Sequence, residues 1–214
     1  FDTDAEKSET LFPEFAAMRG AMYEESVRFL CDLFQRGGAV QELIDADHTF
    51  LDASLAAFYG IPGVQGDGWR RVDGVKRHGR GGVLAQAAVL AAQSGAGRTS
   101  PILRGNWLCE ALLGEKLPRP PKNVPRLPED ESGQELTMRE ITERHTRDPA
   151  CAKCHLRIDP FACALEAYDA IGRRRDHDIG GRPIDTRVKF AGGTEIDGLD
   201  GLRQLLLGPP RHAF

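Results

Sequence analysis

One short stretch of the sequence combines two cysteines and a histidine at a spacing that suits a single cofactor. Cys151, Cys154 and His155 form the pattern C-x-x-C-H. On one helical turn, two cysteines at this spacing can each form a thioether bond to the edge of a porphyrin, and the histidine that follows can bind the iron from below. The stretch therefore predicts one covalently attached haem of the c type, with His155 as the proximal iron ligand.

Two other chemistries use closely spaced cysteines, namely structural zinc binding and thiol redox exchange. A zinc site needs four ligands; Cys163 or His145 could complete it, but the sequence has no second C-x-x-C. A thioredoxin-like C-x-x-C lies at a strand-to-helix junction, whereas residues 136–147 have the pattern of a helix. Both alternatives therefore explain the motif less well than haem attachment does.

The second axial ligand of the iron is marked less clearly than the first. All three methionines precede the attachment site, so the downstream methionine of class I cytochromes c is excluded. We expect His145, ten residues before His155, to be the distal ligand, or else to lie at a helix end bonded to a propionate or the backbone. His78 and Met138 are the next candidates, and an open sixth position is the remaining alternative. The other histidines are expected to be exposed to solvent: His48, His177 and His212.

Composition narrows the classes of function. The net charge of −4 over 214 residues, without a long Lys/Arg tract, argues against a nucleic-acid-binding protein. No apolar stretch reaches the length of a membrane span. The first residues are acidic and polar, unlike a signal peptide. Because haem c is attached outside the bacterial cytoplasm, we expect the chain to be a processed product or fragment of an exported protein, located in the periplasm.

The predicted fold is mainly α. Apolar residues at helical spacing predict a helix over 12–36, in which Met18 and Met22 pack into the core. Asp148-Pro149 is predicted to end one helix and begin the C-x-x-C-H turn, and Asp159-Pro160 to begin the next helix, which runs to Ile171. Further elements are predicted from caps and stop signals. They are helices over 52–59, 100–113, 137–147 and 199–207, a short strand over 69–75, and a helix or extended run over 79–92.

We divide the chain into three parts. Residues 1–66 form a helical part that ends an upstream domain, and residues 67–134 form a middle segment. Five prolines between positions 118 and 128 make an extended connector. Residues 135–214 form a cytochrome-c-like haem segment, which we expect to be truncated. Three cysteines remain, Cys31, Cys109 and Cys163, of which one pair at most can form a disulfide; we expect buried free thiols.

Several strings of the sequence resemble one family, the planctomycete-type cytochrome c proteins built from consecutive domains of unknown function. The strings lie at 45–51, 59–63, 80–84, 98–101, 104–105, 118–128, 148–155, 158–160 and 168–172. The resembling proteins also have a histidine at the position of His145. The resemblance implies an exported haem protein with further domains on both sides of this chain.

The function expected from these observations is one-electron transfer through a single haem c. Phe161 and Leu165 are expected to surround the haem with apolar side chains, and the electron partner would be a redox protein or another domain of the same polypeptide. One alternative is a haem enzyme, a peroxidase or dehydrogenase subunit, with a pocket lined by Arg98, Ser100 and Arg104. The other is a structural or docking module that haem holds together.

Overall fold

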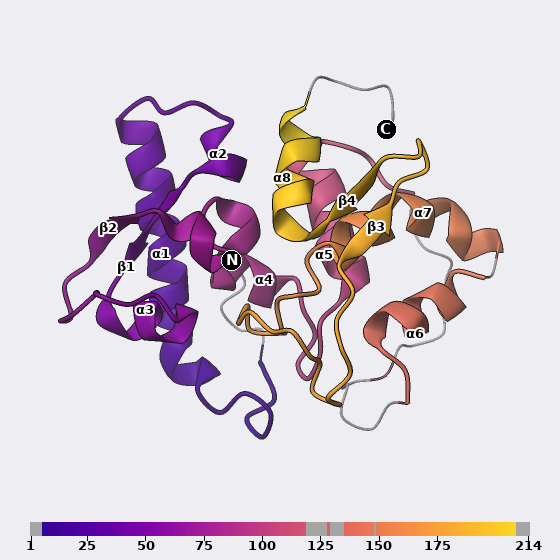
Figure 1. Cartoon of the computed structure of the whole chain (residues 1–214), viewed down its shortest axis with the longest axis horizontal. Helices are drawn as coiled ribbons and strands as arrows, with labels where there is room; N and C mark the ends of the chain where they lie inside the picture. The colour runs from indigo at the N-terminus through magenta and orange to yellow at the C-terminus, as the bar shows by residue number, and fades with distance from the viewer. Residues whose placement is uncertain (1–5, 119–127, 129–134, 148, 209–214) are drawn as a thin grey trace. The chain divides into compact units, whose positions relative to one another are not determined.

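The structure is a computed structural model that describes residues 6–118, 128, 135–147 and 149–208 (Figure 1). Helices predominate in this part of the chain, as predicted, and the strands form two short antiparallel pairs. Most of the predicted Pro-rich connector, residues 119–127, lies outside the described residues. The chain divides into two compact units, Phe1–Ala92 with Ile171–Arg174, and Gln93–Ala170 with Arg175–Phe214. The three-part division by sequence concerns family domains and stays a prediction.

The first unit is built around one long helix and a short hairpin. Its elements are α1 (Phe15–Gln35), α2 (Glu42–Asp45), β1 (His48–Leu51), α3 (Ala53–Tyr59), β2 (Arg70–Asp73), η1 (Val75–His78), η2 (Val83–Ala85) and α4 (Ala87–Ala92). Local signals fix several of these elements. Asp52 caps α3 by accepting a hydrogen bond from the Leu55 backbone N–H at 2.8 Å, and Gly60 ends it in the left-handed conformation, with φ of 68°. The predicted helix over 52–59 is therefore confirmed.

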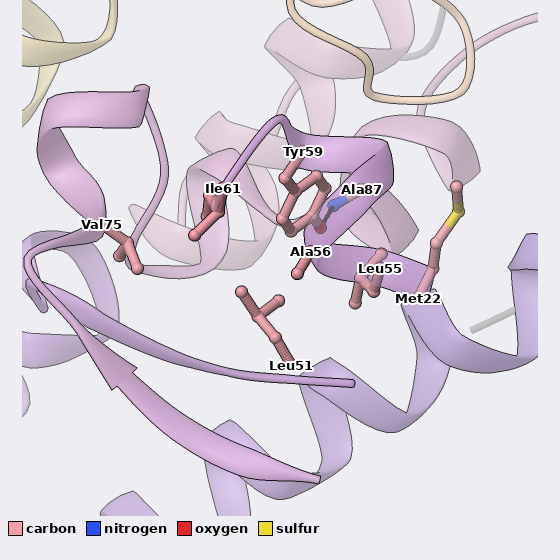
Figure 2. Packing of buried hydrophobic residues seen from close by; sticks show 8 residues of the cluster. All are labelled: Met22, Leu51, Leu55, Ala56, Tyr59, Ile61, Val75 and Ala87. Carbon is pink, nitrogen blue, oxygen red and sulfur yellow. Dashed lines mark hydrogen bonds between the residues drawn. The ribbon is translucent and has the colours of Figure 1, made fainter. Parts of the chain in front are cut away.

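Buried side chains from α1, β1 and α3 meet in the core of the first unit (Figure 2). The cluster consists of Met22, Leu51, Leu55, Ala56, Tyr59, Ile61, Val75 and Ala87. Met22 is fully buried and Met18 packs against the cluster from α1. Both methionines therefore serve the core of this unit, as the helical spacing predicts.

A buried carboxyl group lies beside this core. Glu25 Oε1 accepts a hydrogen bond from Thr49 Oγ1 at 2.6 Å, and its Oε2 accepts one from the Tyr59 hydroxyl at 2.5 Å. The Tyr59 hydroxyl in turn accepts from the Ala87 backbone N–H at 2.9 Å, and the Arg80 guanidinium lies 3.7 Å from the centre of the Tyr59 ring. Burial raises the pKa of Glu25 to about 7, although the two hydroxyl donors and Arg80 act in the opposite direction.

The structure corrects the prediction that His48 is exposed. His48 is the first residue of β1 and is only 3% exposed, with its ring centre 5.6 Å from that of Phe29. The strand was not predicted because its pairing with β2, in which His48 lies opposite Asp73, is between residues distant in sequence. Pairing places the imidazole in the interior, and burial lowers the pKa of His48.

The second unit contains the C-x-x-C-H motif. Its elements are α5 (Pro101–Trp107), the π-helical turn η3 (Leu108–Leu112), α6 (Met138–His145), α7 (Pro149–Cys163), β3 (Arg187–Lys189), β4 (Glu195–Asp197) and α8 (Gly198–Leu207). Ser100 caps α5 and Pro101 is its first residue, as the sequence predicts. The helices predicted over 100–113 and 199–207 are therefore present. The first of them continues from α5 into the π-helical turn η3.

Helix α7 differs from the prediction at Pro160. The helix does not restart at Asp159-Pro160 and run to Ile171; it runs without interruption from Pro149 and ends at Cys163. Proline inside a helix removes one backbone hydrogen bond and crowds the preceding turn, but packing against α5 opposes this effect. A Cβ atom on Gly105 would lie only 2.4 Å from the Ile158 carbonyl oxygen, so the two helices are in backbone contact beside the proline.

The three cysteines outside the motif are free thiols in the structure. Cys109 and Cys163 are buried, as predicted, and burial raises the pKa of their thiols to about 11 and about 12. Cys31 is exposed, which corrects the expectation for that residue. Its position on α1 is therefore on the outer side of the helix, away from the buried residues such as Met22 and Phe29.

Candidate haem-binding site

Two consecutive helices, α6 and α7, carry the candidate site (Figure 1). A capping box begins α6: the Glu140 backbone N–H donates to Thr137 Oγ1 at 3.2 Å, and the Thr137 backbone N–H donates to Glu140 Oε2 at 2.8 Å. Helix α7 begins at Pro149, whose missing N–H costs nothing at the first helical position. These local signals place the C-x-x-C-H motif in the first two turns of α7.

The two motif cysteines share one side of α7 with the histidine. Residues three and four apart on a helix are neighbours on its surface, so Cys151, Cys154 and His155 form one face. Both cysteines are free and half-buried, in contrast to Cys109 and Cys163, which are buried. The motif thiols are therefore the pair that remains accessible for a covalent attachment within this unit.

His155 is held in place by a carboxylate on the next turn of the same helix. The imidazole is 7% exposed, and its Nδ1 lies 2.9 Å from Asp159 Oδ1. An ionised carboxylate only accepts hydrogen bonds, so Nδ1 carries the proton in this bond. The other ring nitrogen, Nε2, is then unprotonated in the neutral imidazole and has the lone pair that a metal ion requires.

The structure brings the two predicted iron ligands together. His145 is the last residue of α6, and the centre of its ring lies 5.1 Å from the centre of the His155 ring, with the ring planes inclined at 70°. Helix α7 begins at Pro149, four residues after His145, so the two helices are close along the chain. Proximity does not establish ligation, so the role of His145 as distal ligand stays a prediction.

A cavity of about 370 Å³ adjoins His155. Residues from α6, α7 and the β3 end of the hairpin surround it, among them His155, Leu156, Asp159, Cys163, Val188 and Phe190. Phe190 packs edge-on against Phe161, with ring centres 5.0 Å apart, and Phe161 and Leu165 are both buried. The imidazole, on the face of α7 that also carries the cysteines, therefore borders a mainly apolar hollow.

Arg104 connects α5 with the segment that follows α7. It is 1% exposed, and its Nη1 donates to the carbonyl oxygens of Leu165 and Tyr168 at 2.9 and 2.7 Å. Its Nη2 donates to the Asp169 carbonyl oxygen at 2.6 Å and to Ser94 Oγ at 3.0 Å. Arg104 therefore joins α5 to the segment that follows α7.

The other two residues of the predicted enzymatic pocket also have structural contacts. Ser100 Oγ accepts the Leu103 backbone N–H at 3.3 Å, which caps α5. Arg98 donates to the carbonyl oxygens of Thr99, at 2.8 Å, and Pro128. Each of these residues therefore has a structural contact, and the enzymatic alternative stays a prediction.

The remaining candidates for iron ligation are Met138 and three histidines. Met138 is buried at the start of α6, and His78 belongs to the first unit, where Arg77 Nε donates to its Nε2 at 3.1 Å. His177 is exposed, as predicted, and His212 lies outside the described residues. In the part of the chain that the structure describes, no three or more His, Cys, Asp or Glu side chains are arranged to hold a metal ion on their own.

Sequence analysis missed Asp159 as a member of the site. The signal was present, because a histidine and an aspartate four residues apart face each other on a helix. The predicted helix break at Asp159-Pro160 would separate the two side chains. That prediction makes Asp159 the start of a new helix and not a partner of His155.

Two family models match the chain. PSCyt3, described as a protein of unknown function (DUF1588), matches residues 80–178, a range that includes the C-x-x-C-H motif. PSD4, a protein of unknown function (DUF1592), matches residues 2–61. Both are families of planctomycete-type cytochrome c proteins, which are multi-domain polypeptides.

No curated protein and no solved structure matches the chain. Among the described residues, no helix is both long and apolar enough to cross a membrane.

Proposed function

We propose that the chain attaches one haem c through Cys151 and Cys154, binds its iron through His155, and transfers single electrons as a module of a larger exported redox protein. The observation that carries the proposal is the geometry of α7. Two accessible thiols and one buried imidazole share a face of the helix, and the Nδ1 bond to Asp159 leaves Nε2 for the metal. The PSCyt3 match over residues 80–178 supports the same proposal.

The donor set fits a haem better than it fits zinc. Two thiols three residues apart, with an imidazole at the position after the second, match the attachment pattern of haem c, and zinc would require a fourth ligand. Bound there, the haem would supply a one-electron couple between ferric and ferrous iron. The electron would come from a reduced partner protein or domain and pass to an oxidised one.

The chain's own residues contribute ligation, orientation and exclusion of water. His155 provides the proximal nitrogen, and Asp159 fixes the imidazole. The buried side chains of Phe161 and Leu165 lie on the same segment and keep the local environment apolar. Electron transfer needs no nucleophile or general acid and base.

We also propose His145 as the distal ligand, because its ring is the neighbouring histidine at 5.1 Å from that of His155. Two histidine ligands would give low-spin iron with a lower potential than a His/Met site. An exported location follows from the covalent attachment, since haem c is joined to protein outside the bacterial cytoplasm.

The proposed function is tested by redox titration of the purified haem protein. We expect one reversible one-electron transition and an absorption spectrum of low-spin, six-coordinate iron. The matched control is Cys163→Ser, which changes a buried thiol on the same helix and should retain both properties, whereas Cys151→Ser with Cys154→Ser should lack covalent haem. High-spin iron that binds exogenous ligands and turns over peroxide would contradict electron transfer and favour the enzymatic alternative.

A further inference from the structure

The hydrogen bond between His155 and Asp159 has a charged acceptor. Asp159 presents a carboxylate to Nδ1 of His155 at 2.9 Å. Hydrogen bonds to an ionised partner are shorter and stronger than neutral ones. The bond joins two residues of one helix, so both ends are fixed by α7 itself.

The negative charge of Asp159 is not shared with a neighbouring cation in an ion pair among the described residues. Two cationic side chains line the cavity beside Asp159, Arg139 and Lys189. Arg139 pairs with Glu143 on its own helix at 3.1 Å, and Lys189 pairs with Glu195 across the hairpin at 3.0 Å. Asp159 itself is half-buried, with its side chain 18% exposed. Its charge therefore acts mainly on the imidazole.

We infer that Asp159 is a positioning residue that holds His155 with Nε2 free for iron and lowers the reduction potential of the haem. The inference rests on the proposed function. A carboxylate that accepts the Nδ1 proton makes the imidazole a stronger electron donor at Nε2. Stronger donation stabilises ferric iron more than ferrous iron, so the potential falls. The site is thereby suited to giving electrons to an acceptor of moderate potential.

The first test is the potential of Asp159→Asn in the haem-bearing protein. Asparagine keeps an acceptor for the Nδ1 proton but removes the charge. We expect the equilibrium preference of the site for ferric over ferrous haem to fall about tenfold, which raises the reduction potential by about 59 mV for one electron. Asp159→Glu, which keeps the charge within reach of the same nitrogen, should return the potential most of the way to the wild-type value.

The matched control is Glu143→Gln. Glu143 lines the same cavity but pairs with Arg139 and not with His155. If Asp159 acts through the imidazole, Glu143→Gln should shift the potential by less than a third as much as Asp159→Asn. Equal shifts in the two variants, or an unchanged potential in Asp159→Asn, would overturn the inference.

A second measurement separates this inference from the proposed function. Nitrogen-15 NMR of His155 reports which ring nitrogen carries the proton, and it can be recorded on the chain without haem. We expect Nδ1 to be protonated in the wild type and both tautomers to be populated in Asp159→Ala. A wild-type chain that never acquires haem would refute the proposed function alone, whereas a wild-type imidazole protonated at Nε2 would refute the role of Asp159.

Discussion

Replacing Glu25 by glutamine should remove a pH-dependent loss of stability from the first unit. Glu25 is 1% exposed, and burial raises its pKa to about 7 from the ordinary value of 4.5. The native state therefore binds the proton more tightly than the unfolded state does. The resulting stabilisation is complete below pH 4.5 and is lost as the pH rises through about 7. The difference between the two pKa values corresponds to about 3 kcal/mol.

The assay is denaturant unfolding of the wild type and Glu25→Gln between pH 4.5 and 8. The chain has two tryptophans, and Trp69 packs against the core of the first unit, so a Trp107→Phe background makes fluorescence specific to that unit. His48 acts in the opposite direction, because burial lowers its pKa. Its stabilisation is lost as the pH falls, so the informative quantity is the difference between the two stability curves.

We expect the unfolding free energy of Glu25→Gln, relative to that of the wild type, to rise by about 3 kcal/mol from pH 4.5 to pH 8. The matched control is Glu24→Gln, which changes the preceding, only partly buried glutamate that pairs with Arg28. Its difference curve should be flat. A flat curve for Glu25→Gln as well would refute the argument that the buried carboxyl group takes up a proton near neutral pH.

Two further changes test the second unit. Arg104→Ala should lower the unfolding free energy of the second unit by about 3 kcal/mol or more, since four buried acceptors lose a charged donor. Thermal unfolding measures this change, with Leu103→Ala as the control on the exposed side of α5. Equal melting temperatures for the two variants would contradict the role assigned to Arg104. His145→Ala should convert low-spin haem iron to a high-spin form that binds exogenous ligands, which absorption spectroscopy follows. The far-ultraviolet circular dichroism should stay unchanged. A low-spin spectrum in this variant would assign the distal position to another residue.

Much of the secondary structure could be predicted because its determinants are local. Asp52 and Gly60 delimit α3, and Ser100 caps α5, through contacts within a few residues of each helix end. The motif of Cys151, Cys154 and His155 is likewise contained in five residues. In each case the residues that determine the local structure lie within about one turn of it along the sequence.

The features that sequence analysis missed depend on distant parts of the chain. Strand β1 exists through its pairing with β2, and that pairing turns His48 inward. Helix α7 continues across Pro160 where α5 packs against it at Gly105. The bond from His155 to Asp159 follows from that continuity, because side chains four residues apart are neighbours only while the helix is unbroken between them. Tertiary packing therefore decides both the helix and one contact of the candidate site.

Covalent attachment of haem is the central claim, and the mass of the denatured polypeptide tests it most directly. The chain would be produced with an export signal in a bacterium that assembles haem c, purified from the periplasm and measured by mass spectrometry under denaturing conditions. We predict the mass of the polypeptide plus one haem, and the polypeptide mass alone for the variant with Cys151→Ser and Cys154→Ser. An unmodified mass for the wild-type chain from that preparation would contradict the account.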